Sequence, residues 1–124
     1  RVNAHVGVPV RLCLDVGHAP HPDERDPYLW LARLGAEAPI VHLQQTEFGY
    51  SRHWPFTPEC NAKGIIEPRR VLDTLAATGI PEVWLGFEVL HRERWEDEER
   101  VLPELIASAA YWREFLPSDG LEWG

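Results

Sequence analysis

Three side chains that can bind a metal ion lie near the ends of three separate apolar segments. Asp15 ends the first segment, His42 lies late in the second, and Glu88 comes near the end of the third. A carboxylate, an imidazole and a second carboxylate suit a divalent ion such as Mn, Co, Mg or Zn. His18 follows Asp15 after Gly17, which permits a sharp turn, so its imidazole is expected at the mouth of the same site. Each residue alone is a weak signal, but their joint placement predicts a metal site.

The three apolar segments have the length and composition of buried strands, and helix signals follow each one. The predicted strands are Val8–Asp15, Pro39–Gln44 and Glu82–Val89. The predicted helices are Tyr28–Leu34 after Asp26 and Pro27, Arg69–Thr78 after Glu67 and Pro68, and Val101–Leu116 after the acidic run Glu96–Glu99. Alternation of strand and helix is the pattern of parallel βα units, whose sites form at the carboxyl ends of the strands.

Three further segments carry structural expectations. The last predicted helix should bury one apolar stripe, made of Leu102, Leu105, Ile106, Ala109 and Trp112. The connection Gln45–Ile66 is long and aromatic, so it should either cover a site or pack on the body of the protein for stability. The opening segment Arg1–Val6 is predicted as the tail of a helix that stops at Gly7.

Composition narrows the class of protein. A net charge of −8 disfavours nucleic-acid binding, and no apolar stretch is long enough to predict a membrane span or a secretory signal, so a cytoplasmic protein is expected. Cys13 and Cys60 are predicted to be reduced. The chain opens on Arg1 without any Met, and a parallel sheet of three strands would have two open edges. These features predict a piece of a larger protein.

Three motifs resemble one known family. The segments Leu14–His18, Val41–Gln44 and Gly86–Glu88 are similar to the last three βα units of the xylose-isomerase-like TIM barrels, the sugar-phosphate isomerases/epimerases and ketose 3-epimerases. The resemblance covers almost the whole chain. It implies an α/β fold in which residues 1–124 form the C-terminal three βα units of a (β/α)8 TIM barrel, as a fragment.

The resemblance also implies roles for individual residues. Asp15, His42 and Glu88 are similar to three of the four metal ligands, and the fourth, a glutamate on an earlier strand, has no counterpart here. His18 is similar to a histidine that contacts substrate oxygens. Glu88 is similar to one of two acid/base glutamates that move a proton through a metal-stabilised enediolate. The missing N-terminal barrel half, or an oligomer partner, would have to supply the rest, so no turnover is expected from the fragment alone.

The chain departs from the ketose 3-epimerases after His42, where those enzymes carry a substrate-binding arginine. Its basic residues come later, as Arg52 and His53, and these are predicted to bind a sugar phosphate, with Lys63 or Arg92 as further candidates. The surrounding run, Ser51–Phe56, resembles members that act on four-carbon ketose phosphates.

Other functions stay open from the sequence. An aldose–ketose isomerase uses the same metal and enediolate chemistry as an epimerase. A metal-dependent endonuclease shares the barrel, but the acidic charge disfavours it. A non-catalytic truncated barrel fragment or assembly subunit is the alternative of a different class, and the absent fourth ligand and open sheet edges support it.

Overall fold

The computed structural model describes residues 7–18, 26–90 and 98–117. The predicted helix tail at Arg1–Val6, the acidic residues before Glu98, and Arg92 lie outside these described residues. The elements are β1 (Cys13–Asp15), α1 (Pro27–Leu34), the 3-10 helix η3 (Gly35–Glu37), β2 (Ile40–Leu43), α2 (Pro58–Asn61), α3 (Pro68–Ala77), β3 (Trp84–Phe87) and α4 (Glu98–Arg113).

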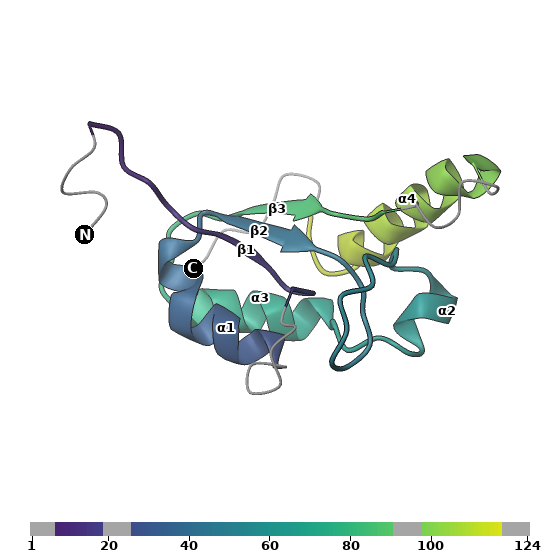
Figure 1. Cartoon of the computed structure of the whole chain (residues 1–124), viewed down its shortest axis with the longest axis horizontal. Helices are drawn as coiled ribbons and strands as arrows, with labels where there is room; N and C mark the ends of the chain where they lie inside the picture. The colour runs from purple at the N-terminus through teal and green to yellow at the C-terminus, as the bar shows by residue number, and fades with distance from the viewer. Residues whose placement is uncertain (1–6, 19–25, 91–97, 118–124) are drawn as a thin grey trace.

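The strands form one parallel sheet in the order β1, β2, β3, which confirms the predicted α/β arrangement (Figure 1). Asp15 is opposite His42 and His42 is opposite Gly86, so all three strands end at the same edge of the sheet. This register is what brings their terminal side chains together.

The first strand is shorter than predicted. Val8 and Val10, expected to be buried, are 75% and 58% exposed. The neighbouring strand β2 starts only at Ile40, because the chain before it forms η3. Leu12 donates its backbone N–H to the carbonyl of Glu37 in η3 at 3.1 Å.

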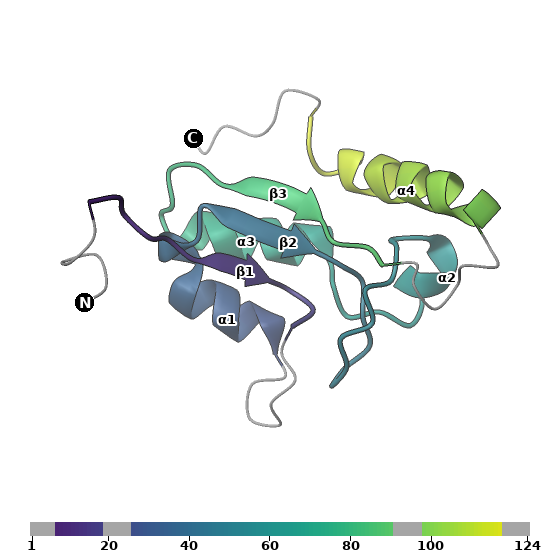
Figure 2. The same ribbon diagram turned by 45° about the horizontal axis from the view of Figure 1, so that its top comes forward.

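Helices α1 and α3 lie side by side against one face of the sheet, as Figures 1 and 2 show. Asp26 begins α1 as predicted, since its carboxylate accepts the Tyr28 N–H at 2.9 Å. Apolar side chains fill the space between these helices and the sheet, and the fully buried ones include Leu31, Val41, Leu43, Val71 and Leu75. The opposite face is exposed at Ile40 and Trp84, so one face of the sheet holds the core and the other is open.

The prediction for the last helix is wrong in its buried face. Leu102 and Ile106 are 65% and 59% exposed, whereas Glu104, Ser108 and Trp112 are buried. The buried residues recur every four positions, so the buried face of α4 is turned away from the predicted stripe and shares only Trp112 with it. The C-terminal end of α4 lies nearest the sheet, as Figure 2 shows. Of the predicted apolar stripe, Trp112 is the residue that becomes fully buried.

An aromatic cluster attaches α4 to the rest of the protein. Phe56 is 1% exposed and packs edge-on against Trp112, with ring centroids 5.4 Å apart, and stacks with Tyr111 at 6.2 Å. Its backbone N–H also donates to the Ser108 hydroxyl at 2.8 Å. The long connection therefore supplies the residue that fastens the last helix.

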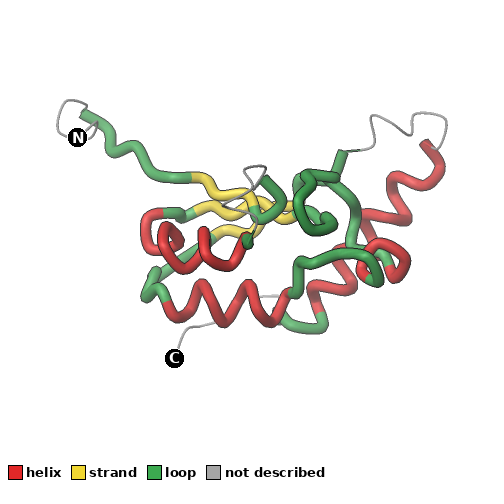
Figure 3. The backbone as a smooth tube through the Cα atoms, turned by 60° about the horizontal axis from the view of Figure 1, so that its bottom comes forward, coloured by secondary structure: helices red, strands yellow, loops and turns green. Residues whose placement is uncertain are grey.

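The connection Gln45–Ile66 contains more structure than predicted. It includes α2 and an antiparallel bridge between Gln45 and Trp54, and Figure 3 shows it gathered at the carboxyl ends of the strands. The Gln45 amide donates to the Asn61 side chain and the Ile66 carbonyl, both at 3.0 Å. The segment packs on the core through Phe56, which is one of the two alternatives, and that it covers a site stays a prediction.

The cysteines and the helices bear on two further expectations. Cys13 and Cys60 are free thiols, as predicted. Within the described part of the chain, no helix has both the length and the apolar character needed to cross a bilayer.

Replacing Phe56 with alanine should lower the free energy of unfolding by about 3–5 kcal/mol, because the change leaves a cavity between α4 and the sheet. Urea unfolding of the natural gene product that contains this sequence would measure the loss. Leu29→Ala, at a site 51% exposed on α1, is the control and should cost about 0.5 kcal/mol or less. Equal losses in the two variants would show that Phe56 does not anchor α4.

Candidate functional site

The three predicted metal-binding residues meet at the carboxyl edge of the sheet. Asp15 is the last residue of β1, His42 lies in β2, and Glu88 directly follows β3. Their candidate ligand atoms all lie within 4.8 Å of one another. The His42 Nδ1 atom is 2.9 Å from Oε2 of Glu88. The convergence expected from the strand ends is therefore present, and the role of the three residues as ligands stays a prediction.

The two oxygens of the Asp15 carboxylate differ in their hydrogen bonding. Its side chain is only 8% exposed. Oδ1 accepts hydrogen bonds from the backbone N–H groups of Gly17 at 2.7 Å and His18 at 3.0 Å, and from the Gln44 amide at 3.0 Å. Oδ2 is buried and makes no hydrogen bond in the described part of the chain, and the nearby His18 Nδ1 atom lies 3.9 Å from it. A buried oxygen of this kind is costly unless a cation or a proton satisfies it.

The two carboxyl groups influence each other's protonation. Burial, followed by the nearby Glu88 carboxyl group, raises the pKa of Asp15 to about 6. The pKa of Glu88 is lowered, first by a hydrogen bond from Asp15 and then by contact with His42. Without a cation, the pair is stabilised when Asp15 carries a proton that it shares with Glu88. A divalent ion would replace that proton.

These observations agree with the donor set that a divalent cation needs. Asp15, His42 and Glu88 offer two carboxylates and one imidazole nitrogen, and one buried Asp15 oxygen makes no hydrogen bond in the described part of the chain. Such a mixture of oxygen and nitrogen ligands suits Mn, Co, Mg or Zn. The residues present therefore fit the metal that the family resemblance implies.

Gln44 is a site residue that sequence reasoning missed. It is completely buried, and its amide nitrogen donates to Asp15 while its oxygen accepts the backbone N–H of His53 at 2.7 Å. The side chain crosses directly over Gly17, where any Cβ atom would clash with it. The close approach explains why a glycine follows the strand. A signal was present in the sequence, since a glutamine at the end of an apolar strand must find buried hydrogen-bond partners.

His18 and His53 both lie in the site. Their Nε2 atoms are 2.9 Å apart, and Nδ1 of His53 is 3.0 Å from the carbonyl oxygen of Glu88. His18 comes from the turn after β1, and His53 comes from the long connection. The structure thus brings together two of the three residues predicted to bind substrate.

Arg52, the third predicted substrate-binding residue, is turned elsewhere. Its Nε donates to the Glu47 carboxylate at 2.7 Å, and its guanidinium lies 4.1 Å from the centre of the Tyr50 ring. Arg52 therefore points toward Glu47 and Tyr50, whereas its neighbour His53 points toward Glu88.

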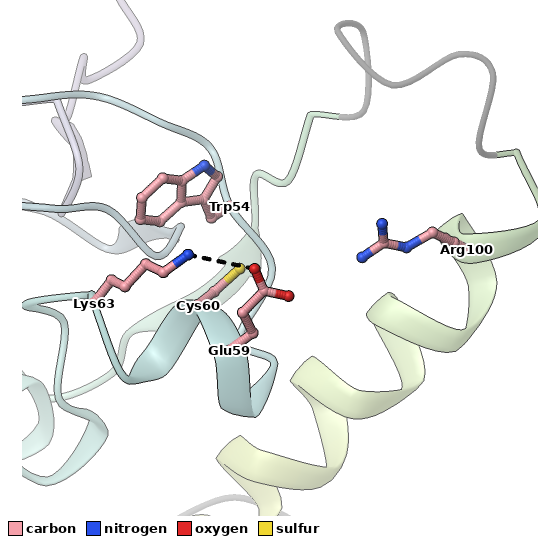
Figure 4. A pocket seen from close by; sticks show the side chains of 5 residues that line it. All are labelled: Trp54, Glu59, Cys60, Lys63 and Arg100. Atoms are coloured by element: carbon pink, nitrogen blue, oxygen red, sulfur yellow. Dashed lines mark hydrogen bonds and ion pairs between the residues drawn. The ribbon is translucent and has the colours of Figure 1, made fainter.

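Lys63 lies in a separate hollow of about 240 Å³ between α2 and the start of α4, lined by Trp54, Glu59, Cys60, Lys63 and Arg100 (Figure 4). Its ammonium group points toward Glu59, 3.4 Å away. Lys63, a further candidate for binding phosphate, is thus paired with a carboxylate outside the cluster around Asp15.

Comparison with known proteins finds similarity to a curated enzyme and to a solved structure. No family model matches the chain. Over 113 residues it is 31% identical to D-erythrulose 1-phosphate 3-epimerase of Brucella abortus, a match that covers 88% of the chain and 36% of the epimerase. A crystal structure of a Rhodospirillum rubrum protein, provisionally assigned as a xylose isomerase, matches with a TM-score of 0.70 and 26% identity, covering 91% of the chain and 38% of that protein.

Both matches confirm the resemblance that the motifs indicated. The chain is related to the xylose-isomerase-like sugar isomerases and epimerases, and its α/β fold matches part of their TIM barrel. It spans well under half the length of either relative.

Gln44→Ala should weaken the affinity for manganese by about 10- to 100-fold, because Asp15 and His53 lose the amide that orients them. Isothermal titration calorimetry measures the change. Gln45→Ala is a matched control, since Gln45 is equally buried but holds the long connection rather than the Asp15 carboxylate. It should reduce stability and leave the affinity within about twofold. Unchanged affinity in the Gln44 variant would contradict this role.

Asp15→Asn should raise the melting temperature of the metal-free protein at pH 8. The folded-state pKa of about 6 lies above the ordinary value of an aspartate, so ionisation of Asp15 costs stability as the pH rises through that range. The uncharged amide avoids this cost, and the gain should vanish near pH 4, where Asp15 is protonated in the folded protein. Thermal melts with and without manganese test both points. Asp73→Asn, on the exposed side of α3, should change neither melt.

Proposed function

We propose that the protein containing this chain epimerises a short ketose phosphate at the carbon beside its carbonyl group, with a divalent metal as cofactor. In this proposal residues 1–124 are the C-terminal three βα units of the barrel. Glu88 is the acid/base residue. Asp15, His42 and Glu88 hold the metal, and a glutamate on an earlier strand completes the site.

One observation carries the proposal: a carboxylate, an imidazole and a second carboxylate converge from three parallel strands, and one buried oxygen of Asp15 makes no hydrogen bond in the described part of the chain. Few structural roles would favour two carboxylates placed so closely, because their mutual repulsion costs stability. The name of the Brucella relative, which acts on a four-carbon ketose phosphate, supports the substrate class.

The chain's own residues can perform half of the proton transfer. The lowered pKa of Glu88 keeps its carboxylate ionised near neutral pH, so it can accept the proton from the carbon beside the carbonyl. The C–H electron pair moves into the carbonyl group and gives an enediolate. When bound, a divalent cation would polarise the carbonyl and hydroxyl oxygens and lower the cost of that charge. Return of a proton on the opposite face gives the epimer and requires the second glutamate.

Substrate contacts are assigned to the two imidazoles and to one arginine. His18 and His53 face the space next to Glu88 and can bind substrate oxygens. Arg52 can bind the phosphate once it leaves Glu47, and an exposed ion pair of this kind costs only about 0–1 kcal/mol to separate.

A second candidate reaction is aldose–ketose isomerisation, which uses the same deprotonation and returns the proton to the neighbouring carbon. The similarity to a protein provisionally assigned as a xylose isomerase favours it. The chain alone, without a second glutamate, should be inactive under either reaction.

Glu88→Gln should slow exchange of the substrate C3 hydrogen with solvent deuterium by about 100- to 10,000-fold, because the amide cannot accept the proton. Proton NMR of D-erythrulose 1-phosphate in deuterium oxide, with the manganese-loaded gene product, follows exchange and identifies the product. Accumulation of the C3 epimer supports epimerisation. Because C1 of this substrate carries the phosphate ester, isomerisation is tested with D-erythrulose 4-phosphate, whose conversion to an aldose phosphate would support that reaction.

The control for this assay is Glu82→Gln, since Glu82 is exposed just before β3, at the other end of the strand from Glu88. It should react at the normal rate. Exchange that persists unchanged in the Glu88 variant would rule out this residue as the base.

A further inference from the structure

Helix α4 carries a row of exposed apolar side chains. Leu102 and Ile106 are 65% and 59% exposed, and Ala109 and Ala110 are exposed on the following turn. We call these four residues the outer stripe of α4. Single exposed apolar residues are normal on protein surfaces, but a row along one helix face is typical of a surface that binds another protein.

The outer stripe faces away from the side of α4 that packs on the rest of the protein. The buried face of the helix consists of Glu104, Ser108 and Trp112. Ile106 is two positions from Ser108, so at about 100° per residue their side chains point about 160° apart. Figure 2 shows α4 at the edge of the molecule. In the proposed barrel, neighbouring helices would lie beside α4 in the same layer and contact its flanks. The outer stripe is therefore available to a partner outside the barrel.

The two ends of the outer stripe carry charges of opposite sign. Glu99 lies seven residues before Ile106, Arg113 lies seven residues after it, and both side chains are exposed. The positions on this face follow one another at spacings of three and four residues, as in a coiled-coil seam: Glu99, Leu102, Ile106, Ala109 and Arg113. An apolar centre with an acid at one end and a base at the other is the result.

A surface of this kind is complementary to itself. When a second α4 is laid against the first in the opposite direction, with the two Ile106 side chains in contact, Glu99 of each copy comes level with Arg113 of the other. Seven residues span about 10 Å of helix, and packed helices lie about 8–10 Å apart, so these long side chains can reach one another. Antiparallel packing also places the positive end of each helix dipole beside the negative end of the other.

We propose that two copies of this chain associate through the outer stripe, with their α4 helices antiparallel about a two-fold axis at Ile106. Leu102 of each copy packs on Ala110 of the other, whose small side chain lets the helices approach closely. One ion pair between Glu99 and Arg113 closes each end of the interface. The proposal is independent of the reaction, so association alone tests it.

Sedimentation velocity of the natural gene product over a range of concentrations measures this association. Ile106→Glu should raise the dissociation constant of the dimer by about 100-fold, because it replaces the central apolar contact with two like charges at the axis. Leu29→Glu is the matched control, since Leu29 is an apolar residue 51% exposed on α1. It should leave the dissociation constant within about twofold.

A charge reversal at exposed positions tests the antiparallel arrangement without disturbing the apolar contact. Arg113→Glu should weaken association by about 10-fold, and adding Glu99→Arg to the same chain should restore it, because both ion pairs then form with exchanged signs. Weak association in the double variant as well would contradict the arrangement.

Two results would overturn the proposal as a whole. One is a wild-type protein that stays monomeric at every concentration. The other is a dimer that Ile106→Glu leaves unchanged. A lower melting temperature of Ile106→Glu together with either result would assign the outer stripe to packing against another part of the same gene product.

Discussion

The side chain of Gln44 connects the sheet, the turn after β1 and the long connection through one buried amide. A buried amide must satisfy both its donor and its acceptor, and here the donor binds Asp15 while the acceptor binds the backbone of His53. Because Gly17 has no Cβ, the amide can lie directly on the turn that follows Asp15. Gln44 has no proposed role in the reaction, yet its amide helps to position both the Asp15 carboxylate and the residue that carries the His53 imidazole.

Gln44 and Gln45 follow one another in the chain, and their side chains bind different parts of the protein. Gln45 faces the long connection and binds Ile66 and Asn61, which fixes the path of that segment. Gln44 faces the candidate site. The connection can therefore anchor α4 through Phe56 and still deliver His53 to the carboxyl edge of the sheet. Stability of the loop and placement of the imidazole are coupled through adjacent residues.

The sequence predicted the strand order and the convergence of Asp15, His42 and Glu88 because parallel strands impose a common carboxyl edge. It failed for α4, since helical periodicity identifies an apolar face but not the neighbour that covers it, and Leu102 and Ile106 are exposed here. The sequence also did not predict the directions in which neighbouring side chains point. Arg52 and His53 are adjacent in sequence, yet the side chain of Arg52 binds Glu47 while that of His53 lies beside the Glu88 carbonyl.

We propose that Asp15, His42 and Glu88 jointly hold one divalent cation. Anomalous X-ray scattering from crystals of the natural gene product grown with manganese tests it most directly, because it locates the ion without reference to activity. The account predicts an anomalous peak among the side chains of these three residues, within about 2.0–2.3 Å of the nearest ligand atoms. A fully occupied manganese peak elsewhere, with these three side chains bonded only to one another, would contradict it.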